Sequence, residues 1–251
     1  TLFQPIFRLN ALSEPSGYEA LTRGPAGSTM ESAAVLFEFV RLKGLEAEFD
    51  RRCVEAALVA ARRLPSGARL ALNVHAATLE RDAGFVDFLI DRAARAEIAV
   101  ARLTLEIVER VPIHLGPRLG GAIARLRGAG AAIAIDDFGS GQANFRLLLE
   151  LRPESLKVDR YLVHGCHSDA ARCAVLRAVA ALAAGIGATT VAEGVQDLED
   201  LVVVTGLGFE HAQGFLLGEP RELPFSGPQA WFAAGVSKQD RAESRSRAGW
   251  M

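Results

Sequence analysis

The chain has 251 residues, half of them apolar, which is enough to fill the core of one large α/β domain. Its formal net charge of −2 argues against a protein that binds DNA or an anionic membrane through bulk charge. Three cysteines without a CxxC pair indicate reduced thiols and a cytoplasmic protein. No stretch approaches the roughly 20 apolar residues of a membrane-spanning helix. The sequence begins without Met, in a strand-like segment, so we expect a domain of a longer protein whose membrane anchor, if it has one, lies elsewhere.

The apolar period alternates between about two and about 3.6, which predicts alternating strands and helices. The first two strands are expected at 2–9 and 17–23, and a short turn around residues 13–17 predicts that they are antiparallel neighbours. Further strands are expected at 69–74, 102–108, 131–135, 155–159, 187–192 and 212–216. Helices are expected at 31–43, 46–63, 76–80, 84–96, 117–128, 145–150, 169–185, 197–205 and 226–236.

Six of the strand-like runs end on a residue that can bind a metal ion or a phosphate. These residues are Glu19, Asn73, Glu106, the pair Asp136-Asp137, Lys157 and Glu193. Parallel strands in a (β/α) barrel bring their carboxyl ends to one mouth, where the active site lies. Carboxylates gathered there repel one another unless cations lie between them. The pattern predicts an α/β protein with a TIM (β/α)8 barrel, modified by an antiparallel first strand, and a metal-dependent enzyme.

The pair Asp136-Asp137 follows a buried strand and precedes Phe138-Gly139-Ser140-Gly141. Adjacent strand residues point to opposite faces, so both aspartates face one site only if the chain turns between them, which the glycines beyond permit. Two adjacent carboxylates suit two divalent cations that share a bridging oxygen. The alternative is an Asp-rich turn that caps the next helix.

Glu106 and Glu109 are three residues apart, so on a strand they face opposite sides. Glu106 closes the apolar run and is the better metal ligand. Glu109 lies just beyond, where it either fixes the loop at 136–144 or is a solvated surface charge.

Four other strand ends carry polar groups that could take part in a site. Asn73 offers a neutral oxygen to a hard cation, or it ends its strand for turn reasons. Lys157 and Asp159 share one strand face, where they either position water beside a phosphate or form a surface ion pair. Glu193 is a candidate general base or metal ligand, and Gln213 places an amide donor at the last strand.

The histidines give little evidence of a site. His164, Cys166 and His167 lie close together, but their spacing fits neither a helix face nor a zinc knuckle, and we expect a solvated loop rather than a metal site. The chain shows no Ser/His/Asp order, so nucleophilic catalysis has little support.

Seven motifs in order resemble those of the EAL family of cyclic di-GMP phosphodiesterases, from Gln4-Pro5-Ile6 to the segment before Pro220. The others are Glu19-Ala20-Leu21 followed by Arg23, Leu105-Glu106-Ile107-Val108-Glu109, Asp136-Asp137-Phe138-Gly139-Ser140-Gly141, Leu156-Lys157-Val158-Asp159, Val191-Ala192-Glu193-Gly194-Val195 and Gln213-Gly214-Phe215. Each motif alone is weak, but seven in the right order are very specific.

The resemblance implies hydrolysis of cyclic di-GMP to linear pGpG with two Mg²⁺ or Mn²⁺ ions as cofactors. It implies that one metal is bound by Glu19, Asn73, Glu106 and Asp136, and the second by Asp137. It implies that Lys157 and Glu193 are catalytic and orient and deprotonate the attacking water. The substrate cleft would be lined by Gln4, Leu21, Arg23, Asp159 and Gln213. Glu109 would support the loop after strand 131–135.

We expect residues 1–236 to form the phosphodiesterase domain and residues 237–251 a polar, frayed tail. The expected partners are cyclic di-GMP, a second copy of the chain in a homodimer, and an upstream sensory or GGDEF domain; DNA is not expected. Two departures from the family pattern are Gln142-Ala143-Asn144 in place of Tyr-Ser-Ser and His75 in place of a serine. The first leaves an alternative open: a weak or inactive EAL domain that binds cyclic di-GMP as a sensor module.

Overall fold

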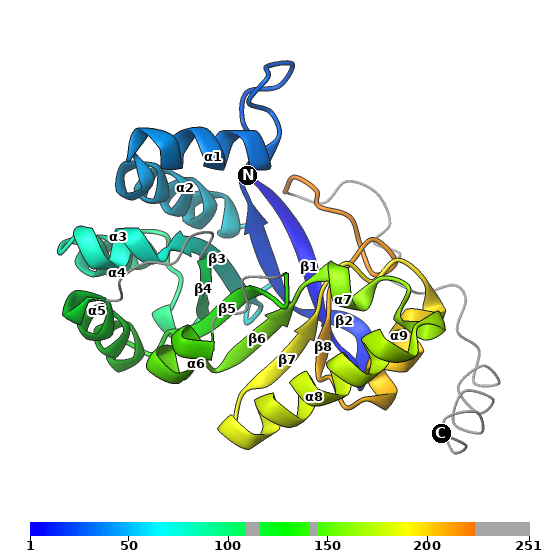
Figure 1. The fold of residues 1–251 in the computed structure, drawn as a ribbon. Helices are drawn as coiled ribbons and strands as arrows, with labels where there is room; N and C mark the ends of the chain where they lie inside the picture. The colour runs from blue at the N-terminus through cyan, green and yellow to red at the C-terminus, as the bar shows by residue number, and fades with distance from the viewer. Residues whose placement is uncertain (109–115, 141–144, 224–251) are drawn as a thin grey trace.

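The computed structural model describes residues 1–108, 116–140 and 145–223, and their strands form a closed eight-stranded barrel surrounded by helices (Figure 1). The strands are β1 (Leu2–Arg8), β2 (Ala11–Leu21), β3 (Arg69–His75), β4 (Leu103–Val108), β5 (Ala132–Phe138), β6 (Ser155–Val158), β7 (Thr189–Ala192) and β8 (His211–Ala212). They pair in chain order, and β8 closes the barrel against β1. The predicted α/β barrel is therefore confirmed.

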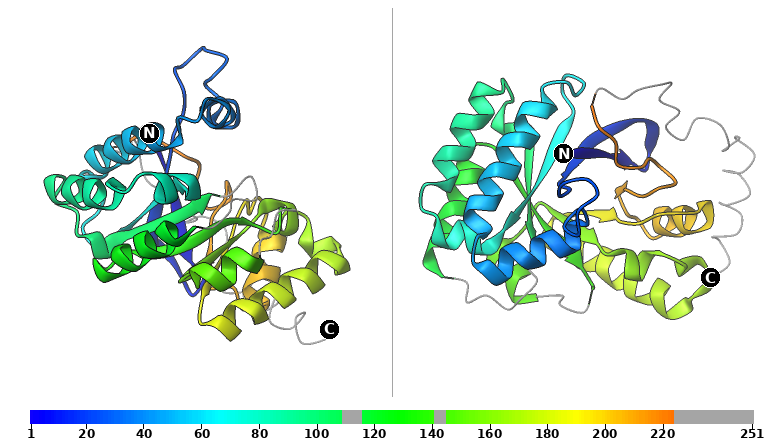
Figure 2. Two further views of the ribbon diagram at one scale, coloured as in Figure 1. Left: turned by 60° about the vertical axis from the view of Figure 1, so that its left-hand side comes forward. Right: turned by 90° about the horizontal axis from the view of Figure 1, so that it is seen from above.

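The helices lie outside the barrel, as the views in Figure 2 show. They are α1 (Ala33–Lys43), α2 (Glu46–Ala61), α3 (Ala76–Arg81), α4 (Phe85–Arg95), α5 (Pro117–Gly128), α6 (Phe145–Leu151), α7 (Arg160–Val163), α8 (Ala170–Ile186) and α9 (Leu198–Gly206), with 3₁₀ turns η1 (Val100–Arg102) and η2 (Cys166–Ser168). The sequence missed α7, η1 and η2 because each is too short to show a 3.6-residue period. The helix expected at 226–236 and the tail from residue 237 lie outside the described residues.

The first strand runs against its neighbours. β1 pairs antiparallel with both β2 and β8, whereas the pairs from β2 to β8 are parallel, which confirms the antiparallel first strand. The turn expected around residues 13–17 is wrong, because β2 begins at Ala11 and only residues 9 and 10 connect the strands. Pro15 is tolerated in β2 because it lies opposite Phe7 at a register shift, where the ladder is already irregular.

Alternation along the strands separates the core from the site. In β4, Leu103, Leu105 and Ile107 are fully buried and belong to the main hydrophobic cluster. Glu106 points to the other face, into the barrel, because successive residues alternate. The same rule brings polar side chains of other strands to the barrel interior.

The last strand and the cysteines can also be compared with what the sequence predicts. The strand expected at 212–216 is only two residues long, and the chain leaves the sheet at Gln213. All three cysteines are free thiols, as expected. Within the described ranges, no helix combines the length and the apolar character that crossing a membrane requires.

Candidate active site

A pocket of about 340 Å³ lies at the carboxyl ends of the parallel strands. This volume is in the range of small-molecule sites, which is roughly 300–1,000 Å³. Eleven of the thirteen residues that the sequence singled out line it: Gln4, Glu19, Leu21, Arg23, Asn73, Asp136, Asp137, Lys157, Asp159, Glu193 and Gln213. Segments far apart in the sequence therefore meet at one mouth.

The ammonium group of Lys157 lies among four carboxylates. Its Nζ is 3.0 Å from Glu19 Oε2, 2.8 Å from Glu106 Oε2, 3.0 Å from Asp136 Oδ1 and 2.8 Å from Glu193 Oε1. The Lys157 side chain is only 3 % exposed, so water screens these charges little. One positive charge does not neutralise four carboxylates when all of them are ionised, so their ionisation favours further cations.

Glu19 has the most complete set of hydrogen bonds in this group. Asn73 Nδ2 donates to Glu19 Oε1 at 2.8 Å, and Gln213 Nε2 donates to Glu19 Oε2 at 2.8 Å and to Gln4 Oε1 at 3.0 Å. Burial acts to raise the pKa of Glu19, but the Lys157 charge and these donors outweigh it and lower the pKa. Glu19 is therefore ionised in the metal-free site.

Glu106 and Glu193 hold their protons more tightly than Glu19 does. Burial, together with the negative charge of Glu19, raises the pKa of Glu106 well above its usual value. Burial also raises the pKa of Glu193 strongly, although Lys157 opposes the shift. The pKa of Lys157 is raised despite burial, since the surrounding carboxylates, first Asp136, stabilise its charge. The site therefore holds a charged ammonium, that of Lys157, within hydrogen-bonding distance of two carboxyl groups with raised pKa values.

Asp136 and Asp137 both reach the pocket because β5 is irregular at its end. Pairing with β6 shifts between Ile135 and Phe138, and Asp137 has a left-handed φ of 51°. The turn that the sequence required between the two aspartates is thus made by Asp137 itself. Carboxylate oxygens of Asp136, Asp137 and Glu193 lie within 4.8 Å of one another, a spacing that a shared cation can bridge.

The donor atoms of this site fit a divalent ion. They are carboxylate and amide oxygens, the ligands that Mg²⁺ and Mn²⁺ prefer. Asp136 Oδ1 is buried and forms an ion pair with Lys157, yet it has no hydrogen bond of good geometry within the described part of the chain. A buried carboxylate oxygen without a hydrogen-bond donor is available to a metal ion.

Asp137 gives the metal-free protein a pH-dependent stability. Burial and the charges of Asp136 and Asp159 raise the pKa of Asp137 from 3.8 to about 6. Between these values the folded protein holds a proton that the unfolded chain has released, so the free energy of unfolding falls as the pH rises from about 4 to about 6. Asp137→Asn keeps the left-handed backbone, which Asn tolerates, and we expect it to reduce this fall by at most about 3 kcal/mol.

Urea unfolding of both proteins without metal, at several pH values, measures the effect. Glu106 and Glu193 are present in both proteins, so the difference between the two pH profiles reports mainly on Asp137. Superimposable pH profiles would show that Asp137 is not protonated in the folded state.

The surroundings of Glu106, Asp159 and Glu109 complete the comparison with the predicted site. Glu106 is 1 % exposed and is absent from the pocket lining, but Lys157 connects it to the other carboxylates. Asp159 lies just beyond β6 rather than in it, and it caps α7 by accepting a hydrogen bond from the Tyr161 amide at 2.8 Å. Glu109 and the altered loop at 142–144 lie outside the described residues.

The sequence reading missed an apolar wall of the pocket, formed by α1 and α2. Its residues include Ala33, Phe37, Cys53, Val54 and Ala57. Phe37 packs edge-on against Phe49 and lies 5.5 Å from the His75 ring, centroid to centroid. The only signal was the apolar face of these helices, which is equally typical of core packing.

His75, the residue in place of the family's serine, has a structural partner. Its Nδ1 and its backbone N lie 2.8 and 2.9 Å from the carboxylate of Asp50, which is 1 % exposed. This pair holds α2 against the end of β3, close to Asn73. His75 is absent from the pocket lining.

Comparisons with known proteins identify relatives with similar sequences. The cyclic di-GMP phosphodiesterase PA2567 of Pseudomonas aeruginosa is 32% identical over 64% of this chain and 27% of its own length. This chain thus spans about a quarter of the curated relatives that it matches.

Solved structures have the same fold. The calcium and cyclic di-GMP complex of Klebsiella pneumoniae BlrP1 is 30% identical with a TM-score of 0.78, covering 88% of this chain and 55% of that one. A standalone versatile EAL protein of Vibrio cholerae O395, in its c-di-GMP-bound form, is 26% identical with a TM-score of 0.77, covering 91% and 95%. The family model of the EAL domain matches residues 1–220, and the chain therefore belongs to the EAL domain family.

Proposed function

We propose that this chain hydrolyses cyclic di-GMP to linear pGpG and that the reaction requires two divalent ions, Mg²⁺ or Mn²⁺. The observation that carries the proposal is the group of four carboxylates around Lys157, beside a pocket large enough for a small molecule. The names of the relatives support it, since PA2567 is called a cyclic di-GMP phosphodiesterase and the BlrP1 complex contains calcium and the cyclic dinucleotide.

The metal ligands that we propose are those that the sequence indicated. Glu19, Asn73, Glu106 and Asp136 would hold the first ion, and Asp137 would serve the second. Asn73 uses its amide nitrogen on Glu19, which leaves its oxygen for the metal. When bound, such ions lower the pKa of a coordinated water and stabilise charge on the leaving oxygen.

Lys157 and Glu193 would act on the attacking water. Glu193 Oε1 lies 2.8 Å from Lys157 Nζ, so one water beside them can contact both side chains. The raised pKa of Glu193 suits a general base, because a base with a pKa closer to neutrality accepts a proton more readily. Lys157 keeps its proton and would orient the water by donating a hydrogen bond.

The substrate would contact the amides, the arginine and Asp159 around the pocket, together with Leu21. Gln213 Oε1 is buried and has no partner among the described residues, so it is an acceptor for a ligand N–H or O–H group. Gln4, which accepts from Gln213, lies next to it. Arg23 lines the same pocket, and its guanidinium is suited to a phosphate oxygen pair.

The whole protein is expected to be larger than this domain. We propose an upstream sensory or GGDEF domain, since the curated relatives are about four times as long as the matched part. We also propose a homodimer in which Glu109 supports the loop after β5, and a cytoplasmic location, which suits three free thiols.

Product analysis tests the proposal. The purified chain is incubated with cyclic di-GMP and Mn²⁺, and the nucleotides are separated by chromatography. We expect pGpG to accumulate, EDTA to stop its formation, and excess Mg²⁺ or Mn²⁺ to restore it. Tight binding of cyclic di-GMP without pGpG over hours would contradict the proposal and favour the sensor module.

A further inference from the structure

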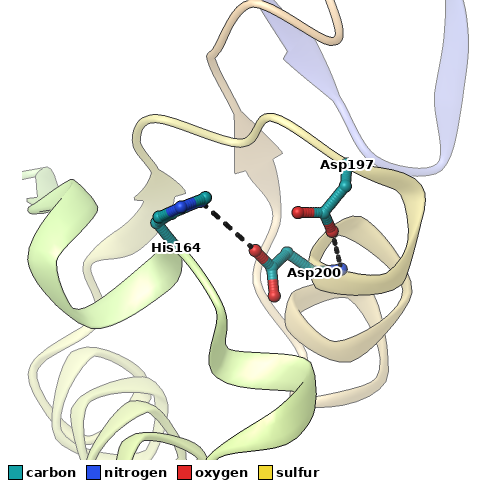
Figure 3. A group of neighbouring side chains, drawn as sticks. All are labelled: His164, Asp197 and Asp200. Carbon is teal, nitrogen blue, oxygen red and sulfur yellow. Dashed lines mark hydrogen bonds and ion pairs between the residues drawn. The ribbon is translucent and has the colours of Figure 1, made fainter.

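A second group of possible metal ligands lies outside the pocket, and Figure 3 shows it. His164 follows α7, Asp197 caps α9, and Asp200 lies in the first turn of α9. One ligand atom from each of the three lies within 4.8 Å of the others, and His164 Nδ1 is 3.9 Å from Asp200 Oδ2. In Figure 3 the imidazole of His164 faces Asp200, and the Asp197 oxygen that does not cap the helix is directed into the space between them.

Asp200 is held as an oriented anion. Its side chain is fully buried and accepts hydrogen bonds from the amides of Gly165 and His167, at 2.7 and 3.0 Å, and lies 2.9 Å from His167 Nδ1. Burial opposes ionisation, but these donors and the thiol of Cys166 together lower the pKa of Asp200. A carboxylate offers about four acceptor positions, so a cation has to displace only the weak S–H donor. Metal-bound carboxylates are typically fixed by outer hydrogen bonds of this kind.

His164 is free to complete the group. Its side chain is 55 % exposed, and within the described part of the chain Nδ1 has only the long ion-pair contact with Asp200. The nearby guanidinium of Arg172 donates to the His164 carbonyl and pairs with Asp169 at 3.4 Å. Its charge is therefore already compensated. His167 Nδ1 lies 2.9 Å from Asp200 Oδ1 and 3.9 Å from Asp197 Oδ1, so a metal ion at this site competes with the proton of His167 for the two aspartates.

We propose that His164, Asp197 and Asp200 form a second cation site, which takes Zn²⁺ or a transition ion of similar preference. Zn²⁺ binds imidazole nitrogen and carboxylate oxygen, and three protein ligands with one open position are typical of its open sites. Mg²⁺ prefers oxygen ligands alone and is a poor match for His164.

The position of this site connects it to the pocket. His164 follows the segment that carries Lys157 and Asp159, whereas Asp197 follows Glu193 by four residues. The two segments already pack closely, because a Cβ added at Gly194 would lie 2.4 Å from Arg160 Cβ. A bound ion would link the two segments directly beside the pocket.

Three variants of the whole chain test the site with Zn²⁺ as the probe. His164→Ala removes an exposed ligand, and Asp197→Asn removes a carboxylate while Asn still caps α9. Glu199→Gln, an exposed neighbour on the same helix, controls for the loss of one negative charge. In equilibrium dialysis we expect the parent chain to bind one more Zn²⁺ than His164→Ala, and Asp197→Asn to bind that ion at least ten-fold more weakly. Glu199→Gln should bind it as the parent does.

A second readout separates this ion from any metal in the pocket. Among the described residues no histidine lines the pocket, so the imidazole coupling to bound Cu²⁺ that His164→Ala removes in pulsed EPR comes from outside the pocket. We expect His164→Ala to lose part of this nitrogen signal and to keep its thermal unfolding temperature without zinc. Equal zinc binding by the parent chain and His164→Ala, or equal losses in Asp197→Asn and Glu199→Gln, would overturn the proposal. Neither result depends on hydrolysis of cyclic di-GMP.

Discussion

Asp136→Asn is expected to lower kcat/KM for cyclic di-GMP by at least about 10³-fold, equivalent to about 4 kcal/mol of transition-state stabilisation. The reason is specific to this carboxylate. Asp136 Oδ1 is buried and forms an ion pair with Lys157, but its charge is repelled by Glu106 and Glu193. Loss of this charge should therefore cost the metal-free fold little, whereas a metal would lose a ligand. Asn has nearly the same shape but binds a divalent ion more weakly, because the charge is gone.

Three measurements separate this result from a folding defect. Steady-state hydrolysis gives kcat/KM, Mn²⁺ titration followed by EPR gives metal affinity, and thermal unfolding gives stability. We expect the first two to fall and the stability to change by no more than about 1 kcal/mol, a common effect of a single substitution. Asp91→Asn, at an exposed position on α4, is the matched control and should leave all three unchanged. Unchanged hydrolysis in Asp136→Asn would mean that Asp136 is not a metal ligand.

The strand endings made most of the site predictable from the sequence. An apolar run that stops at Glu106 or Lys157 places that side chain at the mouth of a parallel barrel, and this placement does not depend on the exact bounds of the helices between the strands. Register then completes the arrangement, since Asn73 pairs with Glu106 and Gln4 with Glu19 across neighbouring strands. These contacts follow from local alternation and barrel closure, so no long-range information was needed.

Features that depend on backbone detail or on distant partners were not predictable. The first hairpin turns at residues 9 and 10, and Pro15 lies within β2 at a register shift that no local pattern indicates. His164 and Asp200 lie 36 positions apart (200 − 164) and approach each other only because the segment after α7 packs against α9, so no local pattern indicated their contact. The side chains of His164 and His167 are exposed, as expected for a solvated loop. Asp137 turns the chain through its own left-handed backbone rather than through the glycines beyond it.

Lys157→Met is expected to destabilise the metal-free protein by roughly 3–5 kcal/mol, because it leaves buried carboxylates without their partner. For a domain of this size that corresponds to a fall of about 10 °C in the unfolding temperature. Lys157 is the only cation that we describe in contact with Glu19, Glu106, Asp136 and Glu193. Methionine fills a similar volume, so the lost charge rather than a cavity should dominate the effect.

A divalent ion should reverse most of this loss, because it supplies the positive charge that Lys157→Met removes. We therefore expect Mn²⁺ to raise the unfolding temperature more in Lys157→Met than in the parent chain, while hydrolysis of cyclic di-GMP stays low since the water-orienting ammonium is absent. Lys43→Met, at an exposed position on α1, is the control and should show neither effect. If metal-free Lys157→Met were as stable as the parent chain, the carboxylates would have to neutralise themselves by taking up protons. The ammonium group would then contribute to the reaction alone and not to the metal-free fold.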